Sequence, residues 1–272
     1  MGDGVTWTST CRAARRRRTA GSVKDMSHVV EQPAASIAPS RPIRAVLLDF
    51  HGTLAQLEPL TDSVRLAAAA RGESLTPDRV AVLAQALADV GWVGAGRPAR
   101  LPDSLAAAWE RRDLSSDDHR RAFVGMAAQV EASPAGFIGL ADEMYARMLA
   151  ADGWIAYADT VSTLSALREA GIPTALVSNI GFDARTVLDH LGVVHLLDEV
   201  LLSFEVGAMK PDPAIFVEAC RRLGVAPEET LMVGDTEADA GARAVGIRTL
   251  LVPFAGPGTV VGLDTILALV RP

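Results

Sequence analysis

Short apolar segments alternate with amphipathic ones over the C-terminal part of the chain, and this alternation constrains the fold most. After Tyr157, segments typical of buried strands are each followed by one whose apolar residues recur every three or four positions, as on one face of a helix. The predicted strands are 173–177, 199–202, 230–233 and 247–252, and the predicted helices are 160–170, 183–191, 213–223 and 238–245. Such alternation is typical of βαβ units and predicts an α/β domain with a parallel sheet.

A further strand is predicted far upstream, at residues 43–50, around the apolar run Ala45–Leu48. Between it and the alternating region lies a long stretch that shows only helical periodicity. Helices are predicted at 63–71, 76–90, 104–112, 116–130 and 137–151. We therefore predict an all-helical insertion, 56–155, that splits an α/β core made of 43–55 and 156–272.

The first 42 residues differ in composition from the rest of the chain. They are rich in Arg, Ser, Ala and Pro and lack periodicity, so residues 1–42 are predicted to form a disordered basic extension. Two interpretations stay open. The extension contacts nucleic acid or another acidic surface, or it is an unstructured segment upstream of a start at Met26.

Charge and hydropathy exclude several classes of protein. The net charge of -7 argues against a general nucleic-acid-binding protein, which usually carries a basic face. No apolar run reaches the roughly 18 residues of a membrane-spanning helix. The arginine run 15–18 is not followed by the apolar segment of a secretory signal. We expect a cytoplasmic protein without nucleic-acid or membrane partners, acting as a monomer or homodimer.

The segment Asp49-Phe50-His51-Gly52-Thr53-Leu54 follows the first predicted strand directly. Ligands of open parallel sheets bind at the carboxyl ends of the strands. A carboxylate at that place can attack phosphorus or carbon and form a covalent intermediate. The alternative is that Asp49 caps a turn or helix, and the residue type alone does not decide between the two.

Two more polar groups follow later strands. Ser178 and Asn179 come after the strand 173–177, where a hydroxyl and the amides of a helix N-terminus either hold an anionic oxygen or cap the helix. Lys210 precedes two prolines, which fix the backbone. This position favours a stationary counter-charge over a solvated lysine.

Asp235 and Asp239 lie four residues apart, after the strand 230–233 and at the start of the next predicted helix. Mg²⁺ is commonly bound through one or two carboxylates together with water and substrate oxygens. Acidic residues at this position also cap helix N-termini. The pair is therefore a candidate metal site with a structural alternative.

In this order, the four groups resemble the motifs of the haloacid dehalogenase-like (HAD) hydrolases, whose first motif usually reads Asp-x-Asp-Gly-Thr. The resemblance extends from residue 43 to the C-terminus. It implies a Rossmann-like parallel-sheet core with a helical cap inserted between the first and second motifs. It also implies a hydrolase, most often a Mg²⁺-dependent phosphatase that acts on a small phosphate monoester.

By this resemblance, Asp49 is the nucleophile that forms an aspartyl-phosphate, and Lys210 neutralises it. The residues implied to bind the transferring group are Gly52, Thr53, Ser178, Asn179 and Lys210. The groups implied to hold Mg²⁺ are Asp49, Asp235 and the main-chain carbonyl of His51, with Asp239 in support directly or through water.

The sequence departs from the family motif at His51, where the phosphatases have a second aspartate that transfers protons. Histidine can protonate a leaving alcohol and deprotonate water, and its reference pKa is about 6.5 against about 3.9 for aspartate. We hypothesise that His51 is a general acid/base with a near-neutral pH profile. The alternative is that His51 only fills space and the reaction is slow or absent.

Two other functions stay open: metal-independent dehalogenation of a 2-haloacid, and a catalytically weak protein that binds a phosphorylated metabolite or a partner protein. Dehalogenases of this family also lack the second aspartate. However, Gly234-Asp235-Thr236 resembles the metal-binding form of the fourth motif, and the first arginine after Leu54 is Arg65. A phosphonatase uses a cap lysine, and this chain has lysine only at positions 24 and 210.

The helical insertion is expected to set specificity by closing over the site. Arg97 and Arg100, in a glycine-rich stretch, are the residues predicted to reach a substrate anion. Trp154 and Tyr157, where the chain returns to the core, are predicted to pack the hinge rather than bind substrate.

Overall fold

The computed structural model describes most of the chain, namely residues 41–92, 98 and 100–270. The predicted basic extension lies outside the described residues, apart from positions 41 and 42, and so does Arg97.

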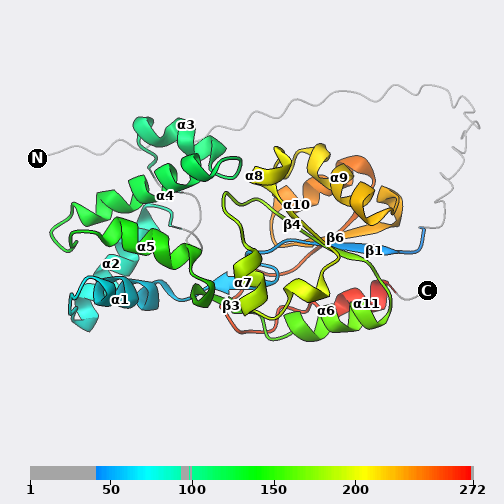
Figure 1. Ribbon diagram of the computed structural model, residues 1–272, viewed down its shortest axis with the longest axis horizontal. Helices are drawn as coiled ribbons and strands as arrows, with labels where there is room; N and C mark the ends of the chain where they lie inside the picture. Colours follow the sequence, from blue (N-terminus) through cyan, green and yellow to red (C-terminus); the bar gives the residue numbers. More distant parts are fainter. Residues whose placement is uncertain (1–40, 93–97, 99, 271–272) are drawn as a thin grey trace, which may run out of the picture. The chain divides into compact units, whose positions relative to one another are not determined.

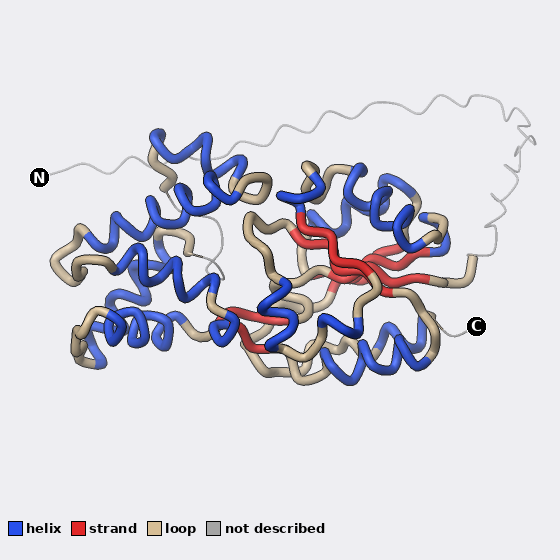
Figure 2. Tube along the Cα trace, viewed as in Figure 1, coloured by secondary structure: helices blue, strands red, loops and turns tan. Residues whose placement is uncertain are grey.

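A five-stranded parallel sheet forms the centre of the described core, in the order β5-β4-β1-β6-β7 (Figures 1 and 2). The strands are β1 (Ala45–Leu48), β4 (Thr174–Ser178), β5 (Glu199–Leu202), β6 (Thr230–Gly234) and β7 (Arg248–Leu251). The first strand is central, with β4 on one side and β6 on the other. The carboxyl ends of these three strands therefore meet, and ligands bind at such a place in open α/β sheets.

Helices cover both faces of this sheet because its apolar side chains alternate between them. Val46 and Leu48 pack in one cluster with Leu164 of α6 and Ile266 of α11. Leu47, between them in the chain, packs in a second cluster with α9. The core helices are α6 (Thr160–Glu169), α7 (Arg185–His190), α8 (Ser203–Val206), α9 (Pro213–Leu223), α10 (Glu237–Ala240) and α11 (Thr265–Leu269). The described part of the chain thus has the predicted α/β fold with a parallel sheet.

A second, antiparallel pair of strands, β2 (Ala55–Leu57) and β3 (Trp154–Ala156), brackets a helical segment. That segment contains α1 (Leu60–Ala70), α2 (Pro77–Asp89), α3 (Asp103–Arg111), α4 (Ser116–Glu131) and α5 (Leu140–Leu149). It has an apolar cluster of its own, built around buried side chains such as Leu83, Met144 and Phe123. The sequence did not predict β2 and β3, because three residues are too few to show an alternating pattern.

Local chemistry explains where several helices begin and end. Thr76 caps α2 by accepting a hydrogen bond from the Arg79 N–H at 3.3 Å, and Ser115 caps α4 in the same way. The sequence predicts a single α-helix over 238–245, and this prediction is wrong for its second part. The helix α10 ends at Ala240, and residues 241–245 form a 3₁₀ helix. A side-chain carbon at Gly241 would lie 2.5 Å from Pro211 Cβ, so the chain turns tightly where it packs on that proline. Further 3₁₀ turns are 151–153, 194–196 and 227–229.

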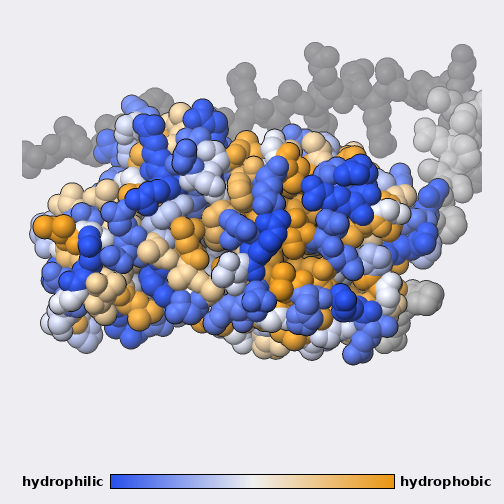
Figure 3. Space-filling model, in the orientation of Figure 1, coloured by the Kyte–Doolittle hydropathy of each residue, from blue (hydrophilic) through white to orange (hydrophobic). Residues whose placement is uncertain are grey.

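Apolar residues at the surface are dispersed among polar ones on the face drawn in Figure 3. The more exposed of them, such as Ile138 and Val260, belong to different segments. Among the described residues, no helix has the length and hydropathy needed to cross a membrane.

Candidate active site

Asp49 stands directly after β1, at the meeting point of the three central strands. Its N–H donates to the Val233 carbonyl at 2.9 Å, which extends the sheet by one residue and fixes the side chain's origin. Oδ1 accepts a hydrogen bond from Lys210 Nζ at 2.5 Å, and Oδ2 lies 3.4 Å from Thr53 Oγ1. Burial raises the pKa of Asp49, and the positive charge of Lys210 opposes that change. The result is a buried carboxylate with a fixed cation beside it.

Lys210 is 4% exposed and joins two carboxylates. Its Nζ lies 2.5 Å from Asp49 Oδ1 and 2.6 Å from Asp239 Oδ1. Burial opposes its charge, but the two carboxylates hold the pKa of Lys210 above its usual value. Asn179 fixes the lysine's backbone, because its amide donates to the Lys210 carbonyl at 2.8 Å and accepts from the Lys210 N–H at 2.7 Å. The role of Asn179 as a phosphate ligand stays a prediction.

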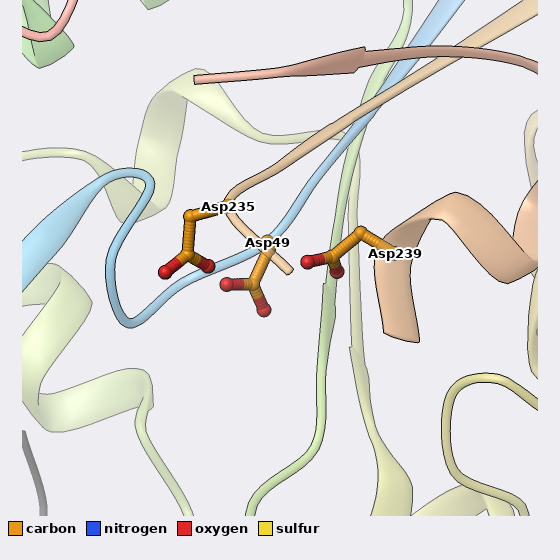
Figure 4. A group of neighbouring side chains, drawn as sticks. All are labelled: Asp49, Asp235 and Asp239. Atoms are coloured by element: carbon orange, nitrogen blue, oxygen red, sulfur yellow. The ribbon is translucent and has the colours of Figure 1, made fainter. Parts of the chain in front are cut away.

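Asp49, Asp235 and Asp239 form a compact acidic group, in which one oxygen of each residue lies within 4.8 Å of the others (Figure 4). Asp239 closes a capping box, since its Oδ2 accepts from the Thr236 N–H at 3.0 Å and from the Thr236 hydroxyl at 2.7 Å. Gly52, with φ of +93°, lies against Asp235, and a side chain there would collide with the Asp235 carboxylate. A glycine at this turn therefore makes room for the second carboxylate.

The donor set of this acidic group fits a divalent cation. Asp235 Oδ1 is buried and has no hydrogen-bond partner among the described residues. Burial and the neighbouring carboxylates of Asp49 and Asp239 raise the pKa of Asp235 to about 7, so Lys210 does not compensate the group's negative charge fully. Carboxylate oxygens are the ligands that Mg²⁺ prefers in proteins. Asp235 therefore offers an oxygen without a partner in the described part of the chain, whereas both oxygens of Asp239 and both of Asp49 accept hydrogen bonds, of which the one from Thr53 Oγ1 to Asp49 Oδ2 is long, at 3.4 Å.

His51 has an apolar setting. Its ring lies 5.6 Å from the Trp154 ring, edge to face, and 6.2 Å from the Phe254 ring. Its Nε2 is buried and has no hydrogen-bond partner among the described residues. Burial lowers the pKa of His51 to about 4. The sequence did not show the rings that bury the imidazole, and the role of His51 as a general acid/base with a near-neutral pH profile stays a prediction.

A cavity of about 680 Å³ opens above these side chains. The predicted site residues that line it are Asp49, His51, Ser178, Asn179, Lys210 and Asp235. Gly52, Thr53 and Asp239 are not among its lining residues but contact those that are, through the interactions given above. Arg100 is exposed and does not line the cavity, and Arg97 is outside the described residues.

Five aromatic residues line the same cavity and form what we call the aromatic wall: Trp109, Phe123, Trp154, Phe182 and Phe254. They come from α3, α4, β3 and two core loops. Trp154 does pack where the chain returns to the core, stacked on Phe50 at 4.7 Å, but it also faces the cavity. Tyr157 does not line it, and its hydroxyl donates to the Ala255 carbonyl.

The sequence analysis missed most of this wall because its members are far apart in the chain. Phe182 has the clearest signal, since it lies three residues after Asn179. Phe123 and Trp109 sit on helical faces that are indistinguishable from ordinary core positions. Phe254 follows the last strand and has no local pattern.

The family follows from sequence comparison. The haloacid dehalogenase-like hydrolase family model matches residues 43–245, and the chain belongs to this family.

Two curated relatives match over a shorter stretch. The glyceraldehyde 3-phosphate phosphatase of Methanopyrus kandleri is 42% identical over 99 residues, 35% of this chain and 42% of that protein. The (S)-2-haloacid dehalogenase 1 of Pseudomonas sp. (strain CBS-3) is 37% identical over 99 residues, 36% of this chain and 44% of that protein. The chain thus spans less than half the length of these relatives.

A solved dehalogenase structure has the same fold, with a TM-score of 0.58 and 24% identity. The match covers 85% of this chain and 98% of that one.

Proposed function

We propose that the protein hydrolyses phosphate monoesters through covalent catalysis by Asp49, with Mg²⁺ as cofactor. One observation carries this proposal. Asp49 accepts a hydrogen bond from the Lys210 ammonium, and one of its oxygens lies within 4.8 Å of an oxygen of Asp235, whose Oδ1 has no partner among the described residues. A nucleophile, a cation and a carboxylate suited to metal binding thus converge at one end of the sheet. The name of the Methanopyrus relative, a phosphatase, agrees with this choice.

In the proposed reaction, an Asp49 carboxylate oxygen attacks the phosphorus atom of the substrate. The bond from phosphorus to the leaving oxygen breaks, and the electron pair departs with that oxygen, which takes up a proton. Water then attacks the same phosphorus, loses a proton and breaks the bond to Asp49. Inorganic phosphate leaves and the carboxylate is restored.

Like-charge repulsion between a carboxylate and a phosphate dianion is the main electrostatic obstacle to this attack. Lys210 offsets part of it, because its ammonium is fixed between Asp49 and Asp239 and needs no reorganisation. Bound at Asp49 and Asp235, Mg²⁺ would supply the remaining positive charge. The Ser178 hydroxyl and the main-chain amide of Asn179 are proposed to hold phosphate oxygens, since the Ile180 N–H already donates to Ser203 Oγ at 2.9 Å and α7 begins only at Arg185.

His51 is proposed as the group that exchanges protons, since it lines the cavity two residues after the nucleophile. Its imidazole replaces the carboxylate that the family's phosphatases have at this position.

The test is hydrolysis of phenyl phosphate from pH 5 to 9 by the full chain, with Mg²⁺ and with a chelator. We expect turnover that requires Mg²⁺ and returns when the ion is restored. Equal rates in chelator would contradict the assigned metal role, and absence of turnover at every pH would overturn the phosphatase proposal.

A second candidate is hydrolytic dehalogenation of a 2-haloacid, favoured by the aromatic wall around Asp49 and by the name of the Pseudomonas relative. Here the Asp49 oxygen would attack carbon, halide would leave with the bonding electron pair, and water would hydrolyse the ester. Halide release from 2-chloropropionate in the presence of chelator, without phosphate release from phenyl phosphate, would favour this candidate over the first.

A further inference from the structure

The aromatic wall is the unusual feature of this cavity. The chain has few aromatic residues, only 5% of the total, yet five of them surround this single space. Phe182 packs between the helical segment and β3, since its ring lies 5.4 Å from the ring of His119 on α4 and 6.5 Å from that of Trp154 on β3. Phe123 continues the row, with its ring 5.7 Å from Trp109. Rings gathered in this way offer faces and edges to another flat ring.

The cations that line the cavity already have partners. Lys210 bridges Asp49 and Asp239. The Arg112 guanidinium lies over the Trp109 ring at 4.6 Å, and its Nη2 is 3.3 Å from Asp113 Oδ2. Both cations among the described lining residues thus already have carboxylate partners, which disfavours a substrate with a carboxylate or a second phosphate.

His119 adds a polar group without adding charge. Its Nδ1 and the Tyr145 hydroxyl lie 3.0 Å apart, and the ring packs 4.6 Å from Phe123. Burial lowers the pKa of His119 to about 3, so the imidazole is neutral over the physiological range. A neutral imidazole between rings suits an uncharged polar substituent on the substrate.

The residue at position 51 gives a separate argument for an aromatic substrate. Position 51 carries histidine where an aspartate would protonate the leaving oxygen. A phenolate is a far better leaving group than an alkoxide and needs little protonation. Replacement of the aspartate lowers the reaction rate least when the leaving alcohol is acidic. An aromatic alcohol is acidic, and it is also flat.

We propose that the substrate is a phosphate monoester of an uncharged aromatic alcohol, whose ring lies against the aromatic wall while its phosphate faces Asp49. This inference rests on the proposed phosphatase function and specifies its substrate class. The volume of about 680 Å³ holds a ring system larger than a single phenyl group together with the phosphate.

The test compares four esters under one set of conditions: phenyl phosphate, benzyl phosphate, 3-glycerol phosphate and phosphoglycolate. Benzyl phosphate keeps the ring but has an alkoxide leaving group, which separates ring recognition from leaving-group acidity. We expect KM to be lowest for the two ring esters and kcat to be highest for phenyl phosphate. A kcat/KM for 3-glycerol phosphate or phosphoglycolate equal to that for phenyl phosphate would overturn the proposal.

Phe182→Leu and Phe204→Leu form a matched pair of variants. Both phenylalanines are half-buried in the core, but only Phe182 lines the cavity. Phe182→Leu is expected to raise KM for both ring esters about tenfold, the size of one lost aromatic pair, with little change for 3-glycerol phosphate. Phe204→Leu is expected to change neither. Equal effects on ring and non-ring esters would contradict the assignment of the wall.

Binding of phenylphosphonate, which cannot be hydrolysed, is measured by calorimetry on the full chain to separate the two proposals. If no ester is hydrolysed but phenylphosphonate binds and Phe182→Leu weakens it about tenfold, the phosphatase function is wrong and the ring site is supported. If esters are hydrolysed without ring preference and phenylphosphonate binds no better than methylphosphonate, the function stands and the substrate class is overturned.

Discussion

The two sides of the cavity are built in different ways. The side formed by the sheet carries Asp49, Lys210 and Asp235. Asp49 and Asp235 follow β1 and β6 directly, and the buried Lys210 ammonium contacts the Asp49 carboxylate. The opposite side, formed by α3, α4 and the turn between them, carries Trp109, Phe123 and the neutral His119, with the Arg112–Asp113 ion pair beside them. Reaction chemistry needs fixed charges, whereas selection of a leaving group needs shape and apolar surface. We therefore expect substitutions on the sheet side to lower kcat and substitutions on the helical side to raise KM.

The largest effect is expected for Asp49→Asn. An amide cannot attack phosphorus, so kcat for phenyl phosphate should fall by about 10⁴-fold or more, as for other removed nucleophiles. Steady-state kinetics with Mg²⁺ measures this loss. Asp264→Asn, an exposed aspartate at the start of α11, is the matched control and should keep wild-type rates. Comparable loss in both variants would mean that the change acts through folding.

Asp235→Asn tests the metal site. Losing this carboxylate, whose Oδ1 has no partner among the described residues, should lower kcat/KM roughly 10²- to 10³-fold at fixed Mg²⁺, as several kcal/mol of charge stabilisation would be lost. A second readout is the rise in melting temperature on adding Mg²⁺, which should occur in the wild type and be reduced in the variant. An unchanged rise in the variant would show that the ion binds elsewhere.

His51→Ala separates proton transfer from the other steps. General acid/base catalysis contributes about 10²- to 10⁴-fold, so we expect a loss of about 10²-fold for 3-glycerol phosphate. The loss for phenyl phosphate should be much smaller, because phenolate leaves without a proton. Equal losses for both esters would assign His51 a packing role beside Trp154 and Phe254.

Gly181→Ala tests how the helical segment meets the core. A side-chain carbon at Gly181 would lie 2.5 Å from His119 Cβ and would also collide with the Arg112 carbonyl. Overpacking of this kind costs about 1–3 kcal/mol, and we expect KM for phenyl phosphate to rise about tenfold while kcat changes little. Gly256→Ala is the matched control, since a side chain there meets nothing within 4 Å. A fall in kcat with KM unchanged would contradict the division between the two sides.

The smallest effect concerns stability and pH. The pKa of His119 is about 3 in the folded protein, below its usual 6.5, so the unfolded chain binds more protons between these values and stability falls as pH falls. Between pH 7 and pH 5, His119 is expected to lower the free energy of unfolding by about 2 kcal/mol. The free energy of unfolding, measured in urea at pH 7 and pH 5, should differ less between the two pH values for His119→Gln than for the wild type. The exposed His190→Gln should behave as the wild type does, and an unchanged difference in His119→Gln would contradict the prediction.

The sheet side could largely be predicted from sequence, and the helical side could not. Asp49, Ser178 and Asp235 each follow an apolar strand, and parallel strands bring their carboxyl ends together whatever the loops do. Phe123 and Trp109 look like core residues of amphipathic helices, and only their packing shows that they line a cavity. The break after Ala240 depends on the approach of Gly241 to Pro211, and the low pKa of His51 depends on Trp154 and Phe254. Contacts between distant segments decide such features.

The most direct test of the central claim is chemical trapping of the intermediate on Asp49. The full chain is mixed with excess phenyl phosphate and Mg²⁺, quenched in acid within milliseconds and reduced with borohydride, which converts an aspartyl-phosphate to homoserine. Peptide mass spectrometry should find homoserine at position 49, and Asp235 and Asp239 should be unchanged. Turnover of phenyl phosphate with position 49 unmodified at every quench time would contradict covalent catalysis by Asp49.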